Sequence, residues 1–433
     1  MTNSQNVRTG GALTASLAVA LAAACGEAGA ASRWVAEIDT VGDTIVVRTI
    51  SGGIWAGEAH LAADLRIGQL EGQDEYLLGN VTGLAVGPGG EMFIYDNQGP
   101  SLRKYDVDGR YLATIGREGG GPGEYKDSDG ALAILKDGRL VLRDPGNARF
   151  QLWAPDGQPA GEWRYVGGFF TSTPMFVDTA GNTYTSAVDF NFRGPPRGPR
   201  LAIYRPDGTA ADTIDAPDWD FEAPTIMAEN ISGQSRSRSV NNVPFSPTEQ
   251  WSFSSHGYFV AGVSNRYAIL LVRPEGLLRI ERLDAPVAVD ASEKANAEEL
   301  AVSNMRRVDS SWKWNGPGIP DTKPAFQSIR VAEDARIWVR ISMPGERIPE
   351  DEVDVPARRP DGVQPPARRW REPVAFDVFE PDGRYVGRVR APTGFSMNPA
   401  PVIRGDTVWA IERDALGVQR LVRYHVRIGQ PSQ

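Results

Sequence analysis

Short stretches in which apolar and polar residues alternate run along most of the chain, and turns that contain glycine separate them. Alternation with a period of two is typical of β-strands that bury one face. At five turns an aromatic or β-branched residue stands four places before a glycine. These turns run from Tyr105, Trp153, Tyr204, Val272 and Phe379 to Gly109, Gly157, Gly208, Gly276 and Gly383, respectively. Asp or Glu precedes each glycine, which would take the left-handed conformation that closes a type I turn with a bulge. The pattern predicts a hairpin at each position.

A second hairpin precedes each of these turns. In the first example, Val81–Val86 and Glu91–Tyr95 flank Gly87-Pro88-Gly89-Gly90. Two consecutive hairpins make a unit of four antiparallel strands, and one such sheet cannot bury both faces until neighbours pack against it. We therefore predict an all-β fold, a six-bladed β-propeller of four-stranded antiparallel blades. The expected blades cover residues about 81–116, 129–165, 174–215, 249–283, 325–390 and 399–426.

The sixth unit supplies only three strands of its own. Thr44–Ile50 is rich in β-branched residues and belongs to no other unit. We predict that this segment joins the C-terminal strands and closes the ring, because closure removes exposed sheet edges. The propeller would then span residues 43–427, with 428–433 as a tail.

Three insertions lengthen the expected blades, at residues 192–200, 228–249 and 343–371. Because they are rich in Gly, Pro, Ser and Arg, we interpret them as mobile surface loops. Between the fourth and fifth blades, Asp290 resembles a helix N-cap with Glu293 three places later. The residues that would share one face of this short helix are Ala297, Leu300, Ala301 and Met305.

The N-terminal residues have the pattern of a bacterial export signal. Arg8 precedes an apolar run from Ala12 to Ala24, which at about 13 residues is shorter than the roughly 20 that a membrane-spanning helix needs. Cys25 is the only cysteine of the chain, and it follows Leu21-Ala22-Ala23-Ala24 as in a lipobox. The sequence thus predicts a lipoprotein rather than a protein with a transmembrane helix.

We therefore expect a signal peptide over residues 1–24 and a linker over 25–42, with the acylated Cys25 attaching the protein to a membrane. Because Gly26 follows the cysteine, delivery to the outer membrane is favoured over retention at the inner membrane. The alternative is ordinary cleavage at Ala28-Gly29-Ala30, which would release a soluble periplasmic protein.

The segment Gly116–Tyr125 reads Gly-Arg-Glu-Gly-Gly-Gly-Pro-Gly-Glu-Tyr. Together with Leu84-Ala85-Val86 and the Asp108-Gly109 turn, it resembles the six-bladed β-propeller lipoproteins of environmental and gut bacteria, which are related in architecture to NHL-repeat propellers. The resemblance covers nearly the whole mature chain and includes Ile337–Arg340. It implies the propeller fold but no activity, since most members have no established function. The insertion at 343–371 departs from the family pattern.

Several classes of function are disfavoured by composition and motifs. The formal net charge is −9 and no long Lys/Arg run is present, whereas nucleic-acid binding needs a concentrated basic face. The Gly-rich segment lacks the Gly-Lys-Ser/Thr ending of a phosphate-binding loop, so we interpret it as a connector between blades. His60, His256 and His425 lie in unrelated places, and no Ser nucleophile elbow is present. We expect no cofactor and no covalent catalysis of a familiar type.

Calcium is the one metal with a candidate site in the sequence. Asp96, Asn97, Asp144 and Asn147 offer hard oxygen ligands at the ends of predicted strands. The alternative is that Asp96 and Asp144 cap the following loops by accepting hydrogen bonds from backbone amides.

One rim of a propeller carries both the loops between the second and third strands of each blade and the connections between blades. Charged candidates for ligand contacts on this rim or in the central funnel are Arg117, Glu118, Glu124, Asp144, Arg149 and Arg340. Each could instead be a solvated charge or bridge two blades. Trp312 and Trp314 follow the predicted helix and could either stack on a sugar or peptide or pack the helix onto the ring.

Two functions remain open at this point. The first is a non-enzymatic binding or scaffolding propeller at the cell envelope, monomeric, with a peptide, glycan or protein partner. The alternative is a calcium-assisted, lactonase-like hydrolase or lyase with its site in the central funnel. Clustered Asp, Asn and Glu along the channel would favour the enzyme, whereas apolar side chains and paired Arg and Glu would favour the binding protein.

Overall fold

The computed structural model describes residues 33–165, 171, 173–187, 199–233, 235–360 and 362–429. The described part is nearly all β, with one α-helix and two short 3-10 helices, η1 (Asp74–Tyr76) and η2 (Pro145–Asn147). The predicted signal peptide, Cys25, residues 192–198 of the first insertion and residues 430–433 of the tail lie outside the described residues. Within the described ranges, no helix is long and apolar enough to cross a membrane.

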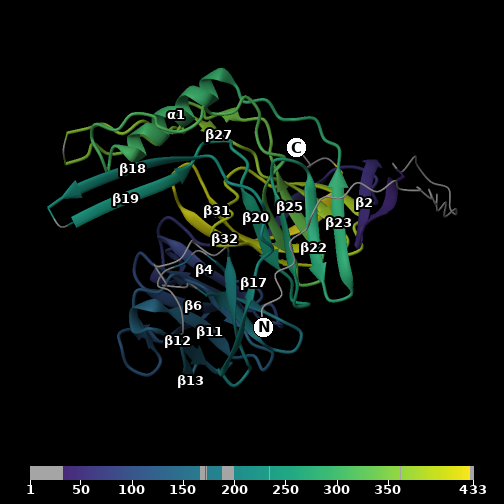
Figure 1. The fold of residues 1–433 in the computed structure, drawn as a ribbon. Helices are drawn as coiled ribbons and strands as arrows, with labels where there is room; N and C mark the ends of the chain where they lie inside the picture. The colour runs from purple at the N-terminus through teal and green to yellow at the C-terminus, as the bar shows by residue number, and fades with distance from the viewer. Residues whose placement is uncertain are drawn as a thin grey trace.

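Three four-stranded antiparallel sheets follow one another in the first half of the chain, each with its strands in sequence order (Figure 1). Unit 1 consists of β4 (Val81–Val86), β5 (Met92–Asp96), β6 (Ser101–Tyr105) and β7 (Tyr111–Ile115). Unit 2 consists of β10 (Leu132–Ile134), β11 (Leu140–Asp144), β12 (Arg149–Trp153) and β13 (Pro159–Arg164). Unit 3 consists of β14 (Phe176–Val177), β15 (Thr183–Ser186), β16 (Arg200–Tyr204) and β17 (Ala210–Asp215).

Three further four-stranded runs lie within two larger sheets. Unit 4 consists of β20 (Glu249–Phe253), β21 (Phe259–Val263), β22 (Ala268–Arg273) and β23 (Gly276–Arg282). Unit 5 consists of β24 (Phe326–Val331), β25 (Ile337–Ile341), β28 (Ala375–Phe379) and β29 (Tyr385–Arg390). Unit 6 consists of β30 (Val402–Arg404), β31 (Thr407–Arg413), β32 (Gln419–Ile428) and, from before unit 1, β3 (Ala59–Ile67). Because β29 also pairs in parallel with β3, units 5 and 6 share one eight-stranded sheet.

The strand that completes unit 6 differs from our prediction. We expected Thr44–Ile50 to pair with the C-terminal strands, and this is wrong. Those residues belong to β2 (Thr44–Ser51), which pairs antiparallel with β1 (Val35–Val41) and in parallel with β23 of unit 4. Gly42, with φ of +65°, allows the tight turn that makes β1 and β2 a local hairpin. The strongly β-prone segment thus pairs with its neighbour in sequence, and β3 pairs with β32 in its place.

Apolar clusters fill the space between neighbouring units. Each of six clusters contains buried residues from two units, and together they join units 1 and 2, 2 and 3, 3 and 4, 4 and 5, 5 and 6, and 6 and 1. The first strands of the units also contact one another: β4 contacts β10 and β30, and β20 contacts β24. Units packed side by side with their first strands innermost are the arrangement of a propeller.

Four of the five predicted turns have the expected geometry. In the first, Gly109 has φ of +83° and its N–H donates to Asp106 O at 3.0 Å. The glycines that repeat this geometry, with φ from +84° to +91°, are Gly157, Gly208 and Gly383. The fifth turn is tighter, because Gly276 already pairs with Arg273 as the first residue of β23.

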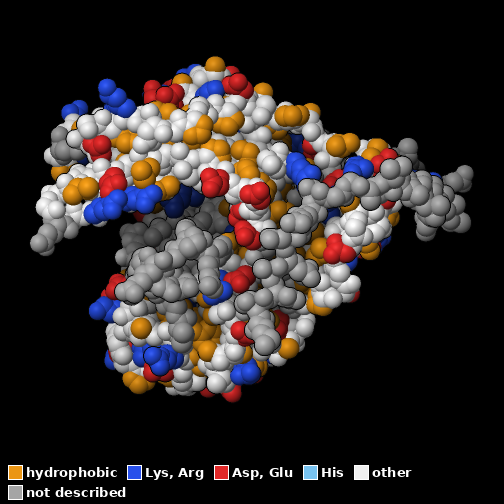
Figure 2. All heavy atoms as spheres, in the orientation of Figure 1, with side chains coloured by type: hydrophobic (Ala, Val, Ile, Leu, Met, Phe, Trp, Pro, Cys, Tyr) orange, Lys and Arg blue, Asp and Glu red, His pale blue; other side chains and the backbone are white. Residues whose placement is uncertain are grey.

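The helix and two of the insertions form a lobe on one side of the units (Figure 1). The lobe consists of the hairpin of β18 (Thr225–Ser232) and β19 (Ser235–Asn242), α1 (Ala291–Met305), and the described residues of the third insertion, with β26 (Glu346–Arg347) and β27 (Trp370–Arg371). Figure 2 shows the molecule hollowed beneath the lobe. The prediction of a loop is therefore wrong for the second insertion, most of which is a hairpin. The third insertion is a loop over most of its described residues, as predicted, and it packs on the helix.

The predicted helix is confirmed, and its contacts explain the order of the lobe. The Asp290 side chain caps α1 by accepting from the backbone N–H groups of Ser292 and Glu293. On the helix, the Asn296 side chain donates to Ala367 O at 3.0 Å and accepts from the N–H of Arg369 at 2.9 Å. These paired amide contacts fix the third insertion against α1.

Candidate functional site

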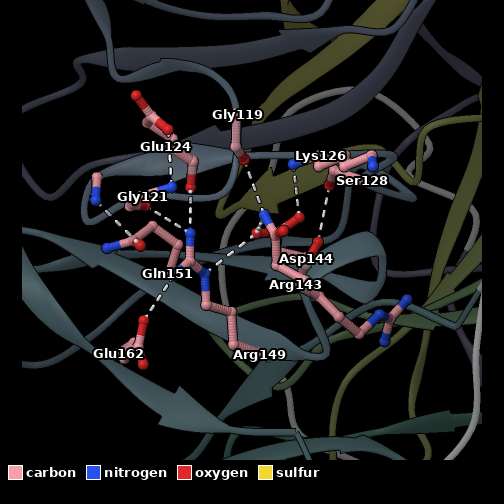
Figure 3. A network of polar contacts seen from close by, with 12 residues as sticks. Gly119, Gly121, Glu124, Lys126, Ser128, Arg143, Asp144, Arg149, Gln151 and Glu162 are labelled. Carbon is pink, nitrogen blue, oxygen red and sulfur yellow. Dashed lines mark hydrogen bonds and ion pairs between the residues drawn. The ribbon is translucent and has the colours of Figure 1, made fainter.

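Most of the predicted rim residues lie in one polar network beside the Gly-rich connector (Figure 3). Asp144, at the end of β11, is fully buried. Its carboxylate accepts from the N–H of Lys126 at 2.8 Å, from Asn147 Nδ2 at 2.8 Å and from Arg149 Nε at 3.3 Å. Burial raises the pKa of Asp144, while these donors act in the opposite direction. Asp144 thus fastens the loop after β11 to the connector that enters unit 2.

The connector itself is held by the other charged candidates. It begins with β8 (Arg117–Glu118), which pairs in parallel with β9 (Glu124–Tyr125). Arg149 Nη2 donates to Gly121 O at 2.7 Å and to Glu124 O at 2.9 Å. The N–H of Gly121 and the guanidinium of Arg117 lower the pKa of Glu124. Arg149 joins unit 2 to the connector, which corresponds to the bridging alternative. Arg117 pairs with Glu124 inside the connector, and Arg117 and Glu118 are exposed, as the alternative of a solvated charge expects.

The predicted calcium ligands do not form one cage. Asp96 ends β5 as Asp144 ends β11, and its carboxylate accepts from the backbone N–H groups of Gly79, Asn80 and Gln98. Asn97 donates its own N–H to Asn80 O at 2.8 Å. This is the loop-capping alternative, repeated in units 1 and 2. In the part of the chain that the structure describes, no group of three or more His, Cys, Asp or Glu is arranged to hold a metal ion.

A cavity of about 1860 Å³ lies between the lobe and the rim of units 5 and 6. Its walls come from α1, from the third insertion, from residues 390–398 between units 5 and 6, and from residues 412–417 after β31. These segments follow second or fourth strands, so the cavity opens on the rim where we predicted ligand contacts. Of the predicted residues, Arg340 lines this cavity, whereas the network around Asp144 does not.

A buried charged triad joins α1 to unit 5 at the cavity wall. Lys323 Nζ lies 2.6 Å from Glu293 Oε1 and 2.8 Å from Glu372 Oε2, and the Lys323 side chain is completely buried. Glu372 also accepts from the N–H of Met343 at 2.9 Å. The other oxygen of Glu293, Oε2, is buried without a hydrogen-bond partner among the described residues. One ammonium therefore serves two carboxylates, and one of the four carboxylate oxygens is left without a donor.

Arg340 lies in β25 on the same wall and is only partly buried. Its Nε is buried and has no acceptor in the described ranges. Burial lowers the pKa of Arg340, and the charge of Glu372 acts in the opposite direction. Buried polar atoms in proteins normally have a partner. An unpaired guanidinium nitrogen and the unpaired Glu293 oxygen in one cavity are therefore groups that a polar ligand can satisfy.

The two tryptophans pack inside the lobe. Trp312 is 5% exposed, and its Nε1 donates to Met227 O of β18 at 2.7 Å. The Trp314 ring lies 6.2 Å from that of Trp312, and its Nε1 donates to Gly316 O at 3.0 Å. This is the packing alternative, although the contacts are to the β18–β19 hairpin and not to the ring.

Sequence reasoning missed four charged residues of this region. Glu293 was considered only as part of a helix cap, and Lys323 and Glu372 lie in irregular segments without a motif. The fourth is Arg330, which interrupts the apolar stretch Ile329-Arg330-Val331, as the predicted Arg340 interrupts Val339-Arg340-Ile341. A charge in the middle of a β-branched inner strand was the signal available, because such positions are normally apolar.

Several solved structures align with most of this chain at TM-scores below 0.5. No family model and no curated protein matches the chain. A member of the DUF4221 family from Bacteroides vulgatus aligns with a TM-score of 0.48 and 10% identity over 86% of this chain and 99% of that one. A candidate exported protein from Bacteroides fragilis aligns with a TM-score of 0.45 and 11% identity, over 86% of this chain and 96% of that one. A gluconolactonase from Xanthomonas campestris aligns with a TM-score of 0.37 and 12% identity, over 87% of this chain and 99% of that one. The propeller assignment therefore depends on the strand pairing and packing described above, and no activity follows from these similarities.

Proposed function

We propose that the six units form one closed six-bladed β-propeller in which β3 completes the sixth blade. The support is the sequence of apolar clusters, which returns from unit 6 to unit 1. At this junction the Gln419 side chain accepts from the N–H of Val81 at 2.7 Å. Units 3 and 4 are also joined by the N–H of Thr179, which donates to Ser255 O at 2.8 Å.

We further propose that the protein is a non-enzymatic binding propeller whose ligand occupies the cavity beneath the lobe. The observation that carries this proposal is the cavity of about 1860 Å³, with the unpaired Glu293 Oε2 and Arg340 Nε in or beside its walls. Small-molecule sites usually measure about 300–1,000 Å³. A peptide, a glycan or a segment of a protein partner therefore suits this cavity better than a small metabolite.

We place this binding at the cell envelope, with acylated Cys25 as the membrane anchor. The support is the lipobox-like sequence that ends at the single cysteine. Globomycin treatment, or the Cys25→Ala variant, should block maturation and leave an unprocessed precursor. A processed, soluble product from the variant would instead support ordinary signal cleavage.

The binding proposal can be tested with a variant that fills the cavity. Ala297 of α1 lines the cavity, and Ala297→Trp would occupy part of it. Leu112→Trp, on the exposed outer strand of unit 1, is the matched control. Peptide and glycan arrays probed with the mature wild-type chain should yield a ligand whose affinity falls at least about tenfold in Ala297→Trp, a loss of about 1.4 kcal/mol, and stays unchanged in Leu112→Trp. Equal binding by both variants would refute the cavity as the site.

The same ligand distinguishes the enzymatic alternative. A calcium-assisted hydrolase or lyase would convert the ligand, or a lactone, to product, and a chelator would abolish the conversion. Chromatography of the ligand after incubation with the protein, with and without calcium, measures this directly. Recovery of intact ligand supports the proposal of a binding protein. Turnover that a chelator abolishes would refute it and support the calcium-assisted enzyme instead.

A further inference from the structure

Two arginines of unit 5 lie on one face of its two inner strands. In the register of β24 and β25, Ser328 is opposite Arg340 and Arg330 is opposite Trp338. Opposite residues of an antiparallel pair point to the same face, so the two arginines are diagonal neighbours. The Cβ atoms of such neighbours are about 7 Å apart or slightly less, which long side chains can span.

The outer part of this face is apolar and its inner part is charged. Trp338, Phe376 and Val389 belong to the cluster that packs unit 5 against unit 6. Arg330 lies on β24, the first and innermost strand of the unit, and Arg340 lines the cavity. Arg340 therefore stands at the cavity wall, and Arg330 is its diagonal neighbour on the same face, one step farther from the cavity.

Neither arginine has the carboxylate partner that other buried blade arginines have. Arg143 Nε lies 2.7 Å from Asp129, and Arg388 Nε lies 2.8 Å from Asp377. In contrast, Nε of Arg330 and Nε of Arg340 are buried without an acceptor within the described residues, and so is Ser328 Oγ. Burial lowers the pKa of both arginines. A buried positive charge without an acceptor reduces stability, and an anion would relieve this cost.

We propose that Arg330, Arg340 and Ser328 bind an oxyanion, namely a carboxylate, phosphate or sulfate group of the ligand. This inference deepens the proposed binding function and rests on it. Guanidinium groups donate two parallel hydrogen bonds to oxyanions, and a hydroxyl can donate a further one. Glu372 does not satisfy Arg340, because its oxygens already accept from Lys323, Gln327 and the N–H of Met343.

The test is the thermal stability of the mature chain with inorganic phosphate, sulfate or acetate, each compared with chloride at equal ionic strength. At least one oxyanion should raise the Tm of the wild type by about 3 °C when it is in roughly hundredfold excess over its Kd. Arg330→Met and Arg340→Met should abolish this increase. Arg384→Met, which removes an exposed arginine from a turn of the same unit, should retain it.

The variants also separate a binding role from a structural one. Because each removes an unpaired buried charge and keeps an apolar stem, their Tm without oxyanion should equal or exceed that of the wild type. A decrease of the Tm in both variants, or a wild type that responds to no oxyanion beyond chloride, would overturn the inference.

The array experiment and the thermal-stability experiment can fail independently of each other. A ligand that Ala297→Trp weakens, combined with no oxyanion response, would retain the cavity and refute the arginine site. An oxyanion response that needs both arginines, combined with array binding indifferent to Ala297→Trp, would retain the site and refute the proposed cavity function.

Discussion

Asp377 is a fully buried acid in β28, between units 4 and 5, and we expect Asp377→Ala to destabilise the protein strongly. The carboxylate accepts from Arg388 Nε at 2.8 Å, from the hydroxyl of Tyr385 at 3.0 Å and from that of Tyr267 at 3.2 Å. Arg282 Nη1 lies 3.6 Å away on the neighbouring unit. Burial raises the pKa of both tyrosines, so both stay protonated and act as donors.

The magnitude follows from what the substitution leaves behind. Alanine would leave two guanidinium groups and two hydroxyls without their shared acceptor in an apolar interface. Breaking a buried ion pair by removing one partner costs about 3–5 kcal/mol. With an unfolding entropy of about 2.1 cal/mol/K per residue over roughly 400 residues, this corresponds to a Tm decrease of roughly 4–6 °C.

Differential scanning calorimetry and urea denaturation of the purified protein measure this loss. Asp377→Asn should lose less, because an amide oxygen still accepts. Asp382→Ala is the matched control, since its ion pair with Arg384 is exposed and worth about 1 kcal/mol or less. A loss for Asp377→Ala no larger than that of the control would refute the assignment of Asp377 as the shared acceptor of this interface.

Three further changes test other parts of the structure. Arg423 lowers the pKa of Asp64 in β3, so the contact stabilises the protein above about pH 4, the pKa of an aspartate in the unfolded chain. This stabilisation is lost as the pH falls through the lower pKa that Asp64 has in the folded protein. The Tm difference between the wild type and Asp64→Asn should therefore shrink from pH 6 to pH 3. Gly208 has φ of +86°, and an added Cβ would overlap the Trp163 indole, so Gly208→Ala should cost about 2–4 kcal/mol in urea denaturation. Lys323→Met leaves two carboxylates without their cation, so hydrogen exchange should accelerate in α1 and remain unchanged in unit 1; equal protection in α1 would contradict the triad's role.

The repeating units could be predicted because their signals are local. The glycine of a bulged turn needs a positive φ, and Gly109 and its equivalents reveal this in a five-residue window. Asp290 was found in the same way, since a cap depends on the next three residues. The choice between β2 and β3 as the last strand was not local. Thr44–Ile50 has the higher strand propensity, but the turn at Gly42 gives it a partner that sequence composition did not reveal.

The candidate site was predicted only in its position on the rim and in Arg340. Lys323 and Glu372 belong to the site because Lys323 contacts both Glu372 and Glu293. Glu293 is 30 positions from Lys323 in the chain and belongs to the helix. No spacing rule relates these three residues, because they meet only when the lobe packs on unit 5. For Asp144 the sequence left two interpretations open, a calcium ligand and a cap. The backbone N–H of Lys126, which donates to the Asp144 carboxylate, decides for the cap, and the sequence does not show which amide lies near a given side chain.

The pairing of β3 with β32 has a consequence for how the molecule is made. The contact between Asp64 and His425 joins residues 361 positions apart. The strand β3 is therefore synthesised early but has no β32 to pair with until nearly all of the remaining chain has been made. Contacts of such long sequence separation form slowly. A nascent chain therefore keeps the apolar faces of its first and last completed sheets uncovered until its final strand has been made, and such uncovered faces favour aggregation.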